Sequence, residues 1–309
     1  MWPKIAACFS MPKVTVGKFQ SLSSRQNKNA VNSPPMKSLG LFLSILLLNS
    51  GLASATDSSL EQQLRKTYVG TERMLRLFYA AADLKFDVDG NPRNKEREGS
   101  WTLLSGVLID KVTLKPKRLE LHGHRRMLVV DEKTKAFRSI KLDETFSIEI
   151  DTQSGPDQAA QIANALDRVF VSADDLVSVV PDYWRDYLAR SSGKSTQGVP
   201  CEDSAAKLVS DDAAGGKVSA GITDGLKVHD VHPTYFQIAR QNRVQGELAL
   251  RAVIDKTGSV SRVCITQALG AGLDDMMVDT VRQWKYRPYT LNGQPIEVQT
   301  TVTTRFGMR

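Results

Sequence analysis

The nine residues ELALRAVID, from Glu247 to Asp255, place apolar side chains at every second position. Alternating apolar residues share one face of an extended chain, so this run predicts a half-buried β-strand. Asp255 to Gly258 predicts a turn, because glycine readily takes a positive φ. Val260 to Thr266 is rich in β-branched residues. The two runs and the turn between them predict a β-hairpin.

The residues after the hairpin predict a helix and a final strand. Apolar residues recur at helical spacing from Leu273 to Trp284, directly after the break at Gly270 to Gly272. Three acids lie toward the start of this run, where they favour the helix dipole: Asp274, Asp275 and Asp279. From Glu297 to Phe306 apolar and polar residues alternate again. The order strand, strand, helix, strand predicts an α+β layer with an antiparallel sheet and helices on one face.

Short motifs occur in a fixed order through this last quarter of the chain: PTY at 233–235, AR at 239–240, DKTGSV at 255–260, LD at 273–274, VRQWKYRP at 281–288 and NG at 292–293. With Gly246 ahead of the first strand, the ordered set resembles the C-terminal domain of the TonB energy-transducing family. The resemblance implies a periplasmic domain that adds a short peptide of an outer-membrane transporter to its sheet edge. The family pattern has Tyr-Pro near the domain start, whereas Tyr235 precedes Phe236, which weakens the inference of a standard transporter partner.

An edge strand offers unpaired backbone N–H and C=O groups to another chain, and strand addition is a known recognition mode. If the family topology holds, the run from Glu297 to Phe306 is that edge. The predicted partner-binding residues are Glu297, Val298, Gln299, Thr300, Thr301, Val302, Thr303 and Tyr235. In the alternative interpretation this strand is only structural, its polar face is solvated, and Tyr235 packs on the sheet.

The first 55 residues predict a targeting segment. Residues 1–35 are polar and are interpreted as a non-native or disordered extension. Residues 36–55 combine a basic start, the apolar run Leu39 to Leu48 and a small-x-small end, which predicts a signal peptide cleaved after Ala55. The apolar run is shorter than the about 20 residues of a membrane-spanning helix. In the alternative, the uncleaved leader is an inner-membrane anchor and the sole membrane contact.

The charge of the chain is concentrated in this leader. The full chain has 41 basic and 34 acidic residues, and residues 1–55 contain Lys and Arg but no acid. Without the leader the balance is close to neutral, and no basic stripe is interleaved with aromatic residues. Nucleic-acid binding is therefore not predicted.

Two cysteines remain after the leader, Cys201 and Cys264. In an oxidising periplasm the two can pair and join the segment ahead of the last domain to its second strand. In the alternative, Cys264 is a small buried hydrophobic residue. The sequence leaves both interpretations open, because it does not give the distance between the two cysteines.

Residues 56–190 predict a middle α+β domain of unknown function. It comprises an amphipathic helix within Leu60 to Leu84, short strands between Trp101 and Ile150, beginning with the extended run Trp101 to Leu104, and a helix from Asp157 to Phe170. A linker follows at 191–216, and the TonB-like domain occupies 217–309. Within the strands, His122 and His124 share one face, but no third ligand follows at metal-binding spacing, so neither a metal nor a cofactor is predicted.

Two functions of different classes follow. The first is a non-catalytic periplasmic protein that binds an envelope partner, in TonB-dependent transport or as an adaptor. Residues 56–216 contain only scattered prolines and cannot form a stiff extended spacer, which favours the adaptor. The alternative is an enzyme or small-ligand-binding protein whose site lies in the middle domain, with Asp87, Asp89, His122 and His124 as donors. A homodimer is left open.

Overall fold

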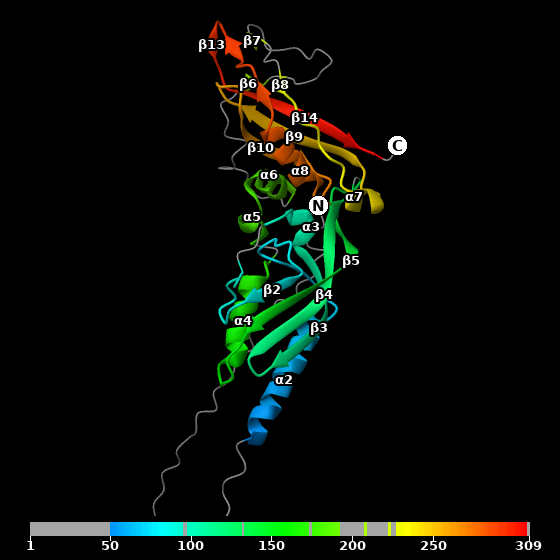
Figure 1. The fold of residues 1–309 in the computed structure, drawn as a ribbon, viewed down its shortest axis with the longest axis vertical. Coiled ribbons are helices and arrows are strands. Elements are labelled where there is room, and N and C mark those ends of the chain that lie inside the picture. Colours follow the sequence, from blue (N-terminus) through cyan, green and yellow to red (C-terminus); the bar gives the residue numbers. More distant parts are fainter. Residues whose placement is uncertain are drawn as a thin grey trace, which may run out of the picture.

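The computed structural model describes residues 50–94, 98–131, 133–172, 175–191, 207–208, 222–223 and 227–307. Within these ranges the chain forms two units of sheet and helix, which follow one another along the long axis of the molecule (Figure 1). Both units mix helices with largely antiparallel sheets, so the fold is α+β, as the sequence predicts. No helix in this part of the chain combines the length and apolar character that crossing a membrane requires.

The middle unit is built on a five-stranded sheet of order β1-β3-β4-β5-β2. Its strands are β1 (Glu72–Met74), β2 (Asp83–Phe86), β3 (Gly106–Lys115), β4 (Arg118–Val130) and β5 (Phe137–Asp151), and its helices are α2 (Ser50–Tyr68), α3 (Trp101–Leu104), α4 (Gln158–Val169), α5 (Leu176–Val179) and α6 (Asp182–Ser191). Alternation along β4 directs Leu119 and Leu121 to one face, where they pack with Leu64 of α2 and Ile162 of α4. On the opposite face, this part of β4 carries the polar side chains of Glu120, His122 and His124.

The middle unit differs from the predicted elements in several places. The helix expected within Leu60 to Leu84 ends at Tyr68, because Gly70 takes a φ of +74° and the chain turns into β1. The run Trp101 to Leu104, expected to be extended, is the helical turn α3. Where short strands were expected between Trp101 and Ile150, β4 is a single long strand from Arg118 to Val130, with an irregularity between His124 and Arg126. Helix α4 matches its prediction within one residue at each end.

The C-terminal unit contains the sheet β10-β9-β14-β6. Its strands are β6 (Lys207–Leu208), β9 (Gly246–Ile254), β10 (Val260–Gln267) and β14 (Val298–Phe306), with α7 (Gln237–Gln241) and α8 (Leu273–Arg282). Smaller sheets pair β7 (Ile222–Thr223), β12 (Thr290–Leu291) and β13 (Gln294–Pro295), and β8 (Lys227–His229) with β11 (Lys285–Tyr286). The predicted hairpin is confirmed, with Gly258 at a φ of +84° in the turn between β9 and β10.

The two units share one apolar core. Trp101, Met127 and Trp184 of the middle unit belong to the same buried cluster as Leu250 and Met277 of the C-terminal unit. Backbone hydrogen bonds also cross between the units, because the N–H of Val130 donates to the Leu269 carbonyl and the N–H of Ala271 donates to the Leu128 carbonyl, both at 2.8 Å. The middle domain is therefore packed directly against the C-terminal domain. The predicted linker at 191–216 lies outside the described residues except for Ser191 and β6.

Candidate functional site

The predicted edge strand β14 has one fully paired side and one largely open side. It pairs antiparallel with β9 from Val298 to Phe306. On its other side, β6 pairs in parallel at Val298 and Gln299 only. Among the described residues no strand pairs with that side from Thr300 to Phe306. The strand begins at Val298, so Glu297, predicted as part of the edge, lies before it and forms an ion pair with Arg262 at 3.3 Å.

The direction of the backbone groups of β14 follows from contacts on the other strands. In β9, the carbonyls of Glu247, Ala249 and Val253 accept hydrogen bonds from side chains of β10. These odd-numbered residues of β9 thus face β10, and the even-numbered ones face β14. Even-numbered residues of β9 and β14 are in register, as in the pair Leu250 and Val302. The N–H and C=O groups of odd-numbered β14 residues therefore point outward.

Four residues of β14 direct backbone groups to the open side: Gln299, Thr301, Thr303 and Arg305. Gln299 faces β6. The side chains of Thr301, Thr303 and Arg305 are exposed. By contrast, Val298, Thr300 and Val302 direct their side chains into the buried face and their backbone groups to β9. Six of the predicted residues, Val298 to Thr303, lie on β14, and every second one directs its backbone groups away from β9.

The structure brings Tyr235 to the end of β14 as a packing residue. Its ring lies 5.5 Å from that of Phe306, and its hydroxyl donates to the Val244 carbonyl at 2.5 Å. The Arg240 guanidinium lies over the same ring. Arg305, which was not among the predicted site residues, has an outward-facing backbone like Thr301 and Thr303. The two-residue alternation along a strand puts Arg305 on the same side as Thr301 and Thr303, and this signal would have added Arg305 to the predicted binding residues.

The other edge of the sheet, strand β10, is covered by the middle domain. Helix α6 packs along β10 (Figure 1). At its end, Nη2 of Arg190 donates to the carbonyl of Ile265 at 3.3 Å. An edge carbonyl of β10 is thus already occupied within the chain. Of the two edge strands, β14 is the one with a long unpaired side in the described part of the molecule.

Comparison with known proteins identifies the unit that carries this edge. Residues 231–308 match the family model of the Gram-negative bacterial TonB protein C-terminal domain. These residues are a TonB C-terminal domain. The chain is also 27% identical over 77 residues to the Protein TonB of Vibrio cholerae serotype O1, a match that covers 25% of this chain and 32% of that relative. A solution NMR structure of the Pseudomonas aeruginosa TonB C-terminal domain aligns at 15% identity with a TM-score of 0.26, over 33% of this chain and 94% of that one.

In the TonB C-terminal domain, two acids of α8 that the sequence assigns to the helix dipole are buried. The carboxylate of Asp275 accepts hydrogen bonds from the hydroxyl of Tyr183 at 2.8 Å and from the indole N–H of Trp184 at 3.1 Å. The hydroxyl of Ser100 donates to the same carboxylate. All three donors belong to the middle domain. Asp275 is therefore a buried polar contact between the two domains, and only the third predicted acid, Asp279, is exposed.

Asp274 is fully buried and accepts the backbone N–H groups of Leu269 at 2.9 Å and Gly270 at 2.6 Å. Burial raises the pKa of Asp274 to about 8, with a further contribution from Asp275, and outweighs the two N–H groups that favour the carboxylate. Burial also raises the pKa of the adjacent Tyr187 to about 12. At neutral pH we therefore expect Asp274 to be largely protonated.

We predict that stability falls as the pH rises from about 4, near the pKa of an unfolded Asp, to about 8, the pKa of folded Asp274. In that range the folded protein binds a proton that the unfolded chain has lost, so the stabilisation is complete below the window and lost above it. Urea unfolding at several pH values measures this slope. The Asp274→Asn variant is expected to be less stable but to show a flatter dependence; an unchanged slope would contradict the assignment.

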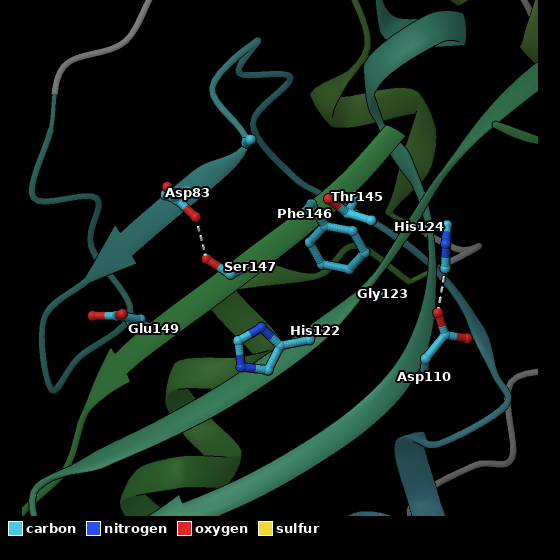
Figure 2. A pocket seen from close by; sticks show the side chains of 10 residues that line it. Asp83, Asp110, His122, Gly123, His124, Thr145, Phe146, Ser147 and Glu149 are labelled. Atoms are coloured by element: carbon cyan, nitrogen blue, oxygen red, sulfur yellow. Dashed lines mark hydrogen bonds and ion pairs between the residues drawn. The ribbon is translucent and has the colours of Figure 1, made fainter. Parts of the chain in front are cut away.

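The middle domain contains an open groove of about 540 Å³ on the polar face of its sheet (Figure 2). The predicted donors His122 and His124 both line it, together with Asp83, Asp110 and Glu149. Asp110 bonds Nδ1 of His124 at 2.5 Å, and Asp83 accepts the Ser147 hydroxyl at 2.6 Å. The described residues contain no cluster of three or more metal-ligating side chains. The groove groups thus pair mainly with one another.

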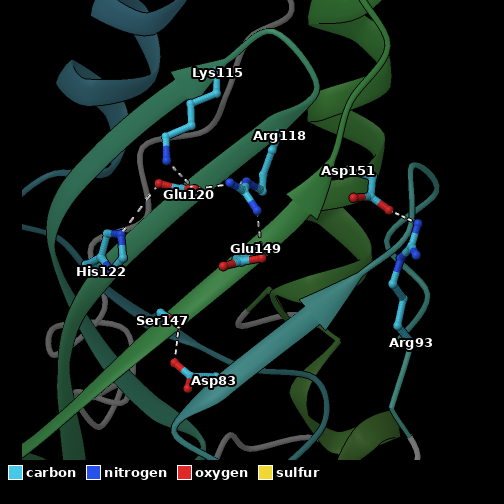
Figure 3. A network of polar contacts seen from close by, with 9 residues as sticks. All are labelled: Asp83, Arg93, Lys115, Arg118, Glu120, His122, Ser147, Glu149 and Asp151. Carbon is cyan, nitrogen blue, oxygen red and sulfur yellow. Dashed lines mark hydrogen bonds and ion pairs between the residues drawn. The ribbon is translucent and has the colours of Figure 1, made fainter.

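Ion pairs extend along the same sheet face (Figure 3). Glu120 bonds Lys115 at 2.7 Å and Arg118 at 2.9 Å, and Arg118 reaches Glu149 at 3.4 Å. Lys115 holds the pKa of Glu120 below its usual value. The other two predicted donors, Asp87 and Asp89, lie in a turn. The Asp87 carboxylate accepts the backbone N–H groups of Asp89 and Asn91, each at 2.9 Å. The charged groups on this sheet face thus pair largely with one another.

Cys264 lies on β10, is 2% exposed, and is disulfide-bonded. Cys201 lies outside the described residues, so its predicted pairing with Cys264 stays a prediction.

Proposed function

We propose that the protein is a non-catalytic periplasmic docking protein whose TonB C-terminal domain binds an outer-membrane transporter, or another envelope protein, by β-strand addition. The observation that supports this most directly is the open side of β14, where Thr301, Thr303 and Arg305 direct N–H and C=O groups outward. In strand addition these main-chain groups provide the affinity, and the alternating side chains provide the specificity.

The TonB family match of residues 231–308 supports a role in transport across the outer membrane and a periplasmic location. TonB domains are typically non-catalytic. The described middle domain is packed against the TonB C-terminal domain through a shared core, and does not project it on an extended arm. A protein of this shape fits the role of an adaptor that binds its partner at close range. The scattered prolines favour the same role, because they cannot form a stiff extended spacer.

We predict that Thr303→Pro weakens partner binding at least tenfold. Proline removes the N–H of an outward-facing residue and places its ring on the open side, but the β9 ladder uses the neighbouring residues and is retained. The probes are synthetic peptides from the N-terminal periplasmic segments of outer-membrane transporters of the same organism. Binding is measured by isothermal titration calorimetry with the purified full chain.

Thr303→Ala is the matched control, because it removes the exposed hydroxyl and keeps the N–H; it is expected to bind like the wild type. Circular dichroism on both variants checks that the fold is retained. Equal binding by Thr303→Pro and the wild type would overturn strand addition at β14, and the absence of binding to any transporter peptide would overturn the transporter as partner.

A further inference from the structure

The open side of β14 is occupied at one end by a segment of the same chain. Strand β6, Lys207–Leu208, lies beside β14 in the position that an added partner strand would take. It is parallel to β14, with Lys207 in register with Val298 and Leu208 in register with Gln299. Of the four outward-facing residues of β14, Gln299 is therefore already paired, and no strand in the described ranges pairs with Thr301, Thr303 or Arg305.

The register identifies which residue of β6 makes this contact. In a parallel pair, a residue bonds to the two residues that flank its register partner. Gln299 faces β6 and is in register with Leu208, so its N–H points to the carbonyl of Lys207, the residue before Leu208. The backbone of Lys207 thus points toward β14, and the backbone of Leu208 points away from it.

We propose that β6 is an internal competitor that limits the length of strand the β14 edge accepts. This rests on the proposed function. A partner that pairs only with Thr301, Thr303 and Arg305 binds beside β6 without disturbing it. A longer partner that also pairs with Gln299 must first displace β6, because both need the same side of the same residue. Displacement is feasible since the described part of β6 pairs with β14 at two residues.

The proposal predicts that two variants of adjacent residues behave differently. Lys207→Pro removes the N–H that points to the Glu297 carbonyl and places the proline ring between β6 and β14, which separates the Lys207 carbonyl from Gln299. Leu208→Pro makes the same change on the side that points away from β14. We measure binding of a five-residue and a nine-residue version of one transporter peptide to the full chain by isothermal titration calorimetry. Lys207→Pro is expected to tighten binding of the long peptide about threefold to tenfold, the equivalent of one or two hydrogen bonds. It leaves the short peptide unchanged, and Leu208→Pro changes neither.

A second measurement needs no partner. Amide hydrogen exchange at Gln299 reports on β6 directly, and Lys207→Pro is expected to speed it severalfold, while Leu208→Pro leaves it as in the wild type. Equal effects of the two proline variants, or none from Lys207→Pro on the long peptide and on Gln299 exchange, would overturn the role of β6. If no peptide binds any variant while Gln299 exchange still responds to Lys207→Pro, β6 pairs as described but competes with no strand; the competitor role then fails together with the proposed function.

Discussion

Replacing Asp275 with alanine is expected to lower the free energy of unfolding by about 2–4 kcal/mol. The substitution leaves the hydroxyl of Tyr183 and the indole N–H of Trp184 without their acceptor in a buried interface. Each unsatisfied buried donor costs about 1–3 kcal/mol, and relief of the buried carboxylate offsets part of the sum. Urea denaturation followed by circular dichroism measures the change.

Asp279→Ala is the matched control, because Asp279 lies one turn further along α8 and is exposed. It is expected to change stability by less than about 0.5 kcal/mol. Asp275→Asn retains one carbonyl acceptor, and its free energy of unfolding is expected to lie between those of Asp275→Ala and Asp279→Ala. If Asp275→Ala and Asp279→Ala unfold alike, Asp275 does not hold the two domains together.

Replacing Gly270 with alanine is expected to have a comparably large effect, about 3–5 kcal/mol, from left-handed strain and overpacking together. Gly270 has a φ of +83°, and an added Cβ would lie 2.3 Å from the Leu128 carbonyl oxygen and 2.7 Å from Cα of Val129. Both atoms are backbone of β4, which cannot move aside without disturbing the hydrogen bonds between the domains. The change therefore strains the loop and separates the units.

Gly293→Ala provides the comparison for this prediction. Gly293 has a φ of +80°, but no atom lies within 4 Å of the added Cβ. This variant therefore measures the backbone strain alone, about 1–2 kcal/mol. Urea denaturation gives the free energy of unfolding of both variants, and the difference between them is the cost of the close contact between residue 270 and β4. Equal losses of stability would show that this contact adds no cost.

The regular elements of the C-terminal domain could be predicted because their signals are local. The alternation in β9 and β14 and the glycine turn at Gly258 depend only on neighbouring residues, and the structure places them where the sequence indicates. The same holds for the helical spacing of α8. The edge strand itself was predicted from the family topology, but which of its residues face outward depends on the register with β9, which is not a local property.

The interface between the domains could not be predicted for the same reason. Asp275 resembles a solvent-facing acid in the first turn of a helix, and its burial depends on Tyr183 and Trp184, far away in the sequence. Trp101 has the β-propensity of a strand residue, yet tertiary packing against Trp184 places it in a helical turn. The pairing of β6 with β14 likewise follows from no pattern in its two residues.

The cover that α6 provides over β10 has a consequence for self-association. A sheet with two vacant borders can receive a neighbour on each, so identical copies can join one after another into an open-ended ribbon. Because α6 of the same chain covers the β10 edge, a copy that accepts a strand at β14 has no second free edge on which to bind another copy. We therefore expect such a molecule to form a one-to-one complex with its partner.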